Sequence, residues 1–175
     1  MLKKIAIAIL AIAVIILGLA LAQPNSFTVT RSITIKAPAE KIYPLISDFH
    51  SWTTWSPWEH LDPKMVRTFS GPANGIGAIY NWEGNDQVGA GRMEIIGASA
   101  PGKVDIKLDF LKPFESHNTC VFTLQPGGDG TNVVWTMSGP SAFITKLMGV
   151  FVSMDKMVGP DFEKGLASMK AVAEK

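Results

Sequence analysis

Six short segments rich in β-branched and aromatic residues follow one another between residues 64 and 139, and glycine or proline separates each from the next. We expect strands at about 64–70, 76–83, 88–99, 103–111, 115–125 and 131–139. The fourth segment alternates apolar residues with charged ones; the apolar residues are Val104, Ile106, Leu108 and Phe110. This alternation is typical of a strand with one buried and one solvent-exposed face. The chain is therefore predicted to form an antiparallel sheet whose apolar face another element must cover.

One strand and one helix precede this run. Apolar residues alternate with Thr and Ser over 27–35, which predicts a half-buried strand. Arg31 breaks the apolar phase, so we expect it near a sheet edge or paired with a carboxylate. A helix is predicted to begin at Pro38, whose missing N–H costs nothing at the first helical position, and to continue through Phe49.

The last part of the chain returns to helical spacing. Apolar residues recur at helical intervals, and Gly159-Pro160 is expected to kink or interrupt the helix. The stripe consists of Phe143, Leu147, Val150, Phe151, Met154, Met157, Phe162, Leu166, Met169 and Val172. The predicted order is therefore strand, helix, six strands and a long helix. This order is typical of an α+β helix-grip fold, in which a curved antiparallel sheet wraps around a long C-terminal helix.

The N-terminus carries Lys3 and Lys4 and then an uncharged run, Ile5–Ala22. At about 1.5 Å per residue a helix of this length spans roughly 27 Å, enough to cross the hydrocarbon core of a bilayer. The run is longer than a usual signal-peptide core, which favours a retained anchor. Ala20-Leu21-Ala22 is also an acceptable cleavage site, so a cleaved signal stays open. Either interpretation keeps the lysines in the cytoplasm and translocates the remainder.

Three segments follow from these patterns. Residues 1–22 are predicted to be a transmembrane anchor or signal peptide, residues 23–26 a short linker, and residues 27–175 one ligand-binding domain. Extended fully, the linker reaches at most about 14 Å, so a retained anchor would hold the domain close to the membrane. The expected location is the cell membrane, single-pass, with the domain on the periplasmic or extracellular side, or export if cleavage follows Ala22.

Composition excludes some functions. The chain has 16 Lys and Arg against 15 Asp and Glu, without the clustered positive charge that a nucleic-acid partner requires. Its single cysteine, Cys120, cannot form an intramolecular disulfide. No motif identifies a cofactor, and no zinc signature is present. His117 and Cys120 are three apart on a predicted strand, so they point to opposite faces and cannot chelate one ion.

Several segments together resemble one protein superfamily. They are Phe27–Pro38, Asp48–Trp52, Trp55–Trp58, Gly75–Gly77 and Gly159–Leu166. Over about residues 25–175 the chain resembles the polyketide cyclase/dehydrase-like branch of the START-like (SRPBCC) superfamily. The resemblance implies the helix-grip fold and a deep, largely apolar cavity between the sheet and the last helix. Members bind lipids, sterols, polyketides or other hydrophobic ligands there, and a minority carry out chemistry.

The expected partner is therefore a hydrophobic small molecule or lipid, with the membrane contacted through the N-terminal helix. Adaptable Met side chains and aromatic residues suit the walls of such a cavity. The predicted ligand-binding residues are Tyr80, Trp82, Arg92, Trp135, Met137, Met154, Met157, Phe162 and Leu166. Which of the strand residues face the cavity depends on strand register, because a slip of one residue reverses every assignment.

Three tryptophans, Trp52, Trp55 and Trp58, lie within seven residues. They are interpreted either as an aromatic lip of the cavity or as packing that anchors a short helical segment to the sheet. If at least two were exposed, they would instead favour a docking site for another envelope protein.

The alternative to a carrier or sensor is a cyclase- or aromatase-type enzyme acting in the same cavity. Its weak catalytic candidates are Glu59, His60 and Arg92, since an acid or base in an apolar setting has a shifted pKa. Glu59, His60 and Asp62 also fit a solvated loop. An enzyme is the less favoured prediction, and it requires at least one candidate to point into the cavity.

Overall fold

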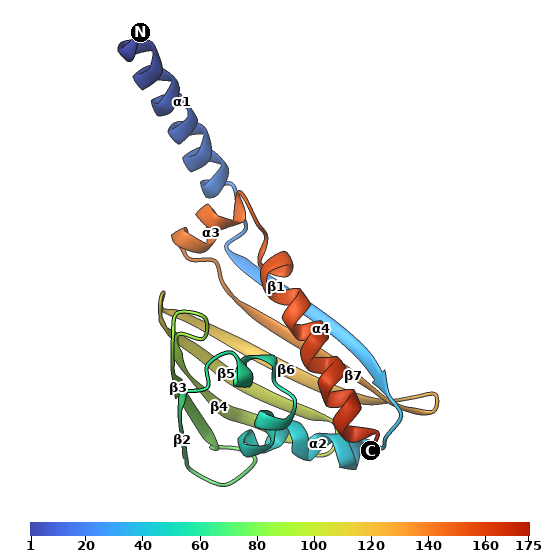
Figure 1. Ribbon diagram of the computed structural model, residues 1–175. Helices are drawn as coiled ribbons and strands as arrows, with labels where there is room; N and C mark the ends of the chain where they lie inside the picture. Colours follow the sequence, from blue (N-terminus) through green and yellow to red (C-terminus); the bar gives the residue numbers. More distant parts are fainter.

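The computed structural model describes residues 1–175. Its strands form one seven-stranded antiparallel sheet in the order β1-β7-β6-β5-β4-β3-β2 (Figure 1). The strands are β1 (Ser26–Ile35), β2 (Val66–Ser70), β3 (Ile79–Glu83), β4 (Ala90–Ser99), β5 (Lys103–Lys112), β6 (Ser116–Gly127) and β7 (Gly130–Pro140). The sheet curls around the last helix, so the predicted helix-grip α+β fold is confirmed.

The helices are α1 (Leu2–Leu21), α2 (Ala39–Ser47), α3 (Phe143–Gly149) and α4 (Met154–Ala173). Two short 3₁₀ helices, η1 (Phe49–Thr54) and η2 (Pro57–His60), follow α2. α4 packs mainly against β1, whereas α2, η1 and η2 lie over the concave side of the sheet (Figure 1). α1 projects from the domain, and it is the one helix long and apolar enough to cross a membrane, a property that a signal sequence shares.

The last helix is not interrupted at Gly159-Pro160, so that part of the prediction is wrong. The helical structure is instead interrupted at residues 150–153, between α3 and α4. There the Ser153 hydroxyl caps α4 by accepting a hydrogen bond from the Lys156 N–H at 3.3 Å. α4 then continues through Pro160. Gly159 serves a close approach rather than an interruption, because a Cβ there would overlap the Arg31 guanidinium.

Strand register defines two ends of the sheet. β1 begins where β7 ends, with Ser26 opposite Pro140, and β6 begins where β5 ends, with Ser116 opposite Phe110. Because β1 begins shortly after α1 ends, we call this end of the sheet the α1 end. At the opposite end the core is filled by Ile35, Ile42, Val104, Phe122, Leu124, Val133, Leu166, Met169 and Ala173.

Arg31 lies on the edge strand β1 and pairs with carboxylates on α4, as its break in the apolar pattern predicts. Its guanidinium donates to Asp155 Oδ1 and to Glu163 Oε1, both at 2.7 Å. The hydrogen bond from Arg31 holds the pKa of Asp155 below its ordinary value. Asp155 also suits the first turn of α4, where the helix dipole favours negative charge.

Replacing Asp155 with Asn should therefore destabilise the protein in a pH-dependent way. Because the folded pKa of Asp155 is depressed, its contribution is present above the unfolded-state pKa and is lost as pH falls through the folded one. The wild-type and Asp155→Asn proteins should differ in urea midpoint near neutral pH and converge in acid. Asp86→Asn, an exposed turn position, is the control. An equal difference at both pH values would refute the role given to this ion pair.

Candidate ligand-binding cavity

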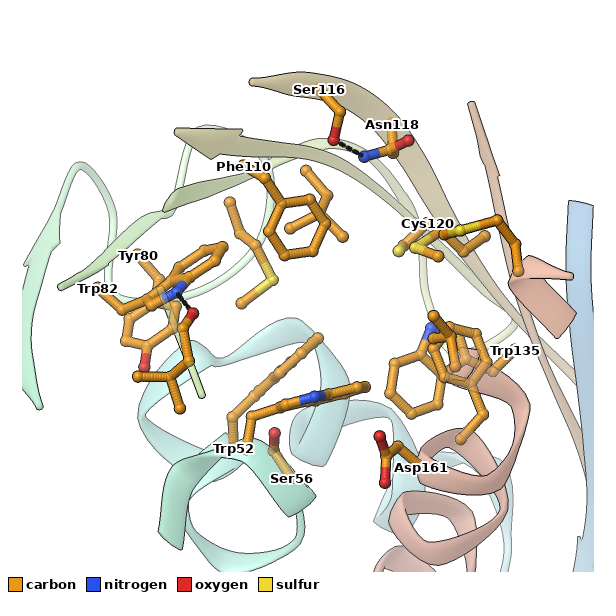
Figure 2. Close-up of a pocket in the computed structure, with 18 of the residues that line it drawn as sticks. Trp52, Ser56, Tyr80, Trp82, Phe110, Ser116, Asn118, Cys120, Trp135 and Asp161 are labelled. Carbon is orange, nitrogen blue, oxygen red and sulfur yellow. Dashed lines mark hydrogen bonds between the residues drawn. The ribbon is translucent and has the colours of Figure 1, made fainter. Parts of the chain in front are cut away.

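A cavity of about 320 Å³ lies between the concave face of the sheet, η1 and η2, and the N-terminal half of α4. Of its 23 lining residues, 16 are hydrophobic, so its chemistry is that of an apolar container with a few polar groups. Its volume falls at the lower end of the range of about 300–1,000 Å³ that small-molecule sites occupy. Figure 2 shows aromatic side chains projecting into this space from several sides.

The sheet wall follows from strand register. Tyr80, Met93, Leu108 and Asn118 stand opposite one another on β3, β4, β5 and β6. All four line the cavity, because directly opposed residues share a face of the sheet. One row further on, Cys120 of β6 stands opposite Met137 of β7.

The helical wall comes from α4 and the 3₁₀ segments. Met154, Val158 and Phe162 are spaced by four residues and line the cavity along one face of α4. Trp52 of η1 and Trp58 of η2 complete this wall beside α4. Phe162 stacks on Trp135 with ring centroids 4.0 Å apart and also meets Trp58 edge to face. These aromatic contacts join α4 to the sheet at the inner boundary of the cavity.

Two buried polar atoms of the lining have no hydrogen-bond partner, Asn118 Oδ1 and Trp135 Nε1. The Asn118 amide nitrogen donates to Ser116 Oγ at 3.1 Å. Gly139 makes room for this amide, since a Cβ there would overlap Oδ1. Unpaired buried polar groups are rare, so each is a candidate contact for a polar group of a ligand.

A third polar feature joins η2 to the sheet. Glu59 is buried and accepts hydrogen bonds from the Tyr80 hydroxyl at 2.6 Å and from Arg67 Nε at 2.6 Å. Burial and the bond to Glu59 raise the pKa of Tyr80 above its usual value. Both carboxylate oxygens of Glu59 are thus occupied by protein donors, and this arrangement fixes the position of η2.

Cys120 lies in the lining next to these groups, and burial raises the pKa of its thiol to about 12. Because the thiolate is the reactive form, the folded protein should react very slowly with a disulfide reagent near pH 8. The rate should rise to that of a free thiol when urea unfolds the protein. Equal rates in the folded and unfolded states would contradict the buried placement.

Six of the predicted ligand-binding residues lie in the lining: Tyr80, Trp82, Trp135, Met137, Met154 and Phe162. Three others lie elsewhere. Arg92 neighbours Met93, which faces the cavity, so the side chain of Arg92 faces the other side of the sheet and pairs with Glu94 at 2.7 Å. Met157 is exposed on a different face of α4, and Leu166 is buried in the core one turn beyond Phe162.

Each of the two interpretations of the tryptophan cluster holds for some of its members. Trp52 and Trp58 line the cavity, but Trp55 does not. Trp55 is 2% exposed and donates from Nε1 to the Leu45 carbonyl at 2.7 Å, and Trp52 donates to Ile46 O at 3.0 Å. Trp55 is therefore packing that ties η1 to α2, and the expected lip is wrong for this residue.

Among the weak catalytic candidates only Glu59 reaches the cavity. His60 is exposed, and Arg92 lies on the other face of the sheet. The solvated-loop interpretation is wrong for Glu59 and Asp62, which are both buried. No three His, Cys, Asp or Glu side chains are arranged to hold a metal ion.

Sequence reasoning missed several lining residues: Phe27, Ser56, Met65, Val88, Met93, Leu108, Phe110, Ser116, Asn118, Cys120, Pro140, Thr145, Val158 and Asp161. Apart from Pro140 at the end of β7, those on the strands follow the same alternation as Tyr80, Trp82, Trp135 and Met137, so correct register would have found them. Of those outside the strands, Val158 follows Met154 by four residues and so shares its helical face. The others gave no local signal, because their positions depend on how the connecting segments and helices pack.

Comparison with solved structures places the fold among known ones. A protein of Chromobacterium violaceum is 14% identical with a TM-score of 0.60, over 87% of this chain and 99% of its own. Aha1 of Colwellia psychrerythraea is 20% identical with a TM-score of 0.58, over 85% of this chain and 96% of its own. BexL, the di-domain ARO/CYC protein from the BE-7585A biosynthetic pathway, is 16% identical with a TM-score of 0.64, over 90% of this chain and 53% of its own.

At these identities the structural neighbours establish the fold alone. A search of curated proteins returned no match. A family model described as polyketide cyclase/dehydrase and lipid transport matches residues 26–174, which is nearly the entire domain that follows α1. The segments that carry the family resemblance in the sequence lie within this match. The chain therefore belongs to the polyketide cyclase/dehydrase and lipid transport family.

Proposed function

We propose that this protein binds a hydrophobic small molecule or lipid in the cavity between the sheet and α4, and that it serves as a carrier or sensor of that ligand. The observation that supports this best is a cavity of about 320 Å³ with 16 hydrophobic lining residues, in a domain whose other half is well packed. Moving apolar ligand surface from water into it contributes about 25 cal/mol per Å². Affinity therefore needs few polar contacts.

The membrane is part of this proposal. α1 is 20 residues long, with a mean hydropathy of 2.8, and Lys3 and Lys4 stand at its start. We propose that α1 is a single-pass anchor with the lysines in the cytoplasm and the domain on the outer side. Cleavage after Ala22 would give an exported protein with the same cavity. Resistance of the full chain to alkaline extraction from its own membranes tests the anchor separately from the cavity.

The ligand-binding proposal is tested with N-phenyl-1-naphthylamine, an apolar probe that fluoresces in dry surroundings. Four tryptophans line the cavity, Trp52, Trp58, Trp82 and Trp135, so bound probe should emit when tryptophan is excited. Saturable energy transfer with one site per chain is the expected result. Probe fluorescence that rises linearly without saturation would count against the proposal.

An enzyme of the cyclase or aromatase type is the second candidate, because Glu59 lies in the lining. Acid–base catalysis requires a carboxylate free to exchange a proton with the substrate. The bonds from Tyr80 and Arg67 already occupy both oxygens of Glu59. This geometry favours binding over catalysis. A Glu59→Gln variant that binds the probe as wild type does would agree with a structural Glu59.

A docking role for the tryptophan cluster has no comparable support. It requires at least two exposed tryptophans, and Trp52 and Trp55 are both buried.

A further inference from the structure

We infer that the cavity opens toward the membrane, with α3 and the β5–β6 turn resting in the lipid headgroup region of the bilayer that α1 crosses. The ligand would then pass between bilayer and cavity without crossing water. This inference rests on the proposed function, since it requires both a ligand-binding cavity and a retained α1.

The cavity lies at the α1 end of the sheet. Phe27, Phe110, Ser116 and Pro140 all line it, and register places them where β1 and β6 begin and β5 and β7 end. Pro140 is exposed, whereas Phe110 and Ser116 are partly exposed. Trp135, on the inner side, is buried. Part of the lining therefore reaches the surface at the end of the sheet nearest α1, and Trp58, Val158 and Asp161 are also partly exposed where η2 meets α4.

Exposed apolar side chains surround this end. We call them the apolar rim: Leu111 and Phe114 at the β5–β6 turn, and Phe143, Met148, Phe151 and Val152 in and after α3. Phe151 is 69% exposed, Phe114 55% and Phe143 52%. Exposed aromatic residues that are grouped in this way, and not scattered singly over the surface, mark an interaction surface. The two parts of the rim come from segments far apart in the sequence that lie at the same end of the molecule (Figure 1).

α3 lies level with the outer end of the membrane helix. It packs beside the C-terminal end of α1, where Ala20 is fully buried, and Gly149 approaches Gln23 (Figure 1). At about 1.5 Å per residue α1 spans about 30 Å, the thickness of the hydrocarbon core. Its C-terminal end, and α3 with it, therefore lies at the membrane–water interface.

The chemistry of the α3 segment suits a lipid surface. From Ser141 to Ser153 the only charged residue is Lys146, and its ammonium is directed back to Asn25 Oδ1. An apolar helical segment at an interface buries its side chains about 5–10 Å into the headgroup and acyl boundary. The rim is continuous with α1, and this continuity favours the same bilayer over a separate protein partner.

The test uses the full chain with Cys120→Ala, reconstituted into phosphatidylcholine–phosphatidylglycerol vesicles. Single cysteines introduced as Phe143→Cys, Phe151→Cys or Phe114→Cys carry an environment-sensitive NBD fluorophore. Matched controls are Ile76→Cys, 60% exposed at the opposite end, and Ile96→Cys, 51% exposed on β4. Nitroxide-labelled lipid in the vesicles quenches fluorophores that lie in the bilayer.

Blue-shifted, lipid-quenched emission at positions 143, 151 and 114, with water-like, unquenched emission at 76 and 96, is the expected result. Emission at 143 and 151 that matches the controls would overturn the inference and would leave a protein partner for the rim. Quenching at 143 and 151 but not at 114 would overturn the orientation of the cavity opening. Alkaline extraction and probe binding, measured on the same samples, report separately on the anchor and on the cavity.

Discussion

Phe162→Ala should lower the free energy of unfolding by about 3–5 kcal/mol, the usual cost of removing a buried aromatic side chain. Phe162 is 1% exposed, lies against Trp135 at 4.0 Å between ring centroids and meets Trp58 at 6.2 Å. It joins α4 to both the sheet and η2 through these two aromatic contacts. Its loss removes dispersion contacts on both sides and enlarges the cavity.

Urea unfolding followed by circular dichroism measures this effect. Phe151→Ala is the matched control, because Phe151 is the same residue type at 69% exposure and should change stability by no more than about 0.5 kcal/mol. A loss at Phe162 as small as the loss at Phe151 would show that α4 is not held by this stack.

Leu108→Trp should abolish probe binding while the protein stays folded. Leu108 faces the cavity from the middle of the sheet wall, opposite Met93 and Asn118. A larger ring there occupies the space that a ligand needs, and overpacking costs about 1–3 kcal/mol in stability. The affinity for N-phenyl-1-naphthylamine should fall more than about tenfold, which corresponds to about 1.4 kcal/mol of binding free energy.

Leu61→Trp is the control for this variant. Leu61 is 44% exposed and lies outside the lining, so the same substitution should leave probe affinity unchanged. Probe fluorescence under direct excitation is the readout, because each variant adds a tryptophan. Wild-type affinity in folded Leu108→Trp protein would mean that the probe binds somewhere other than this cavity.

The fold could be predicted because its signals are local. Alternation in residues 103–111 and the glycine and proline breaks between strands place each strand to within a few residues of its position in the structure. Arg31 could also be predicted, since a charge in an apolar phase needs a carboxylate or an edge, and the structure provides both.

The interruption that Gly159-Pro160 predicts in the C-terminal helix is absent for a physical reason. Gly159 and Pro160 have low helix propensity, but tertiary contacts outweigh it here, because Gly159 lets Arg31 approach α4. The actual break at residues 150–153 precedes a serine cap, and the directions of α3 and α4 on its two sides are set by α1 and β1. The apolar residues recur at helical intervals whether the helix is interrupted at Gly159-Pro160 or at residues 150–153, so the periodicity does not locate the interruption.

The site was only partly predictable. Aromatic and methionine residues such as Trp135 and Met137 were found because they are large and apolar, but Arg92 was assigned to the wrong face because register is not encoded locally. Asn118 and Cys120 were missed or set aside because a lone polar residue in a strand gives no signal. Their place in the lining depends on pairing between β6 and its neighbours.

The central claim is that this cavity holds a hydrophobic ligand. Native mass spectrometry of the full chain, purified from its own membranes and followed by organic extraction, tests it most directly. The predicted result is one defined hydrophobic molecule bound at one per chain in wild type and in Leu61→Trp, and absent from Leu108→Trp. Unliganded wild-type protein that also fails to bind the apolar probe, or the same extract from Leu108→Trp as from wild type, would contradict it.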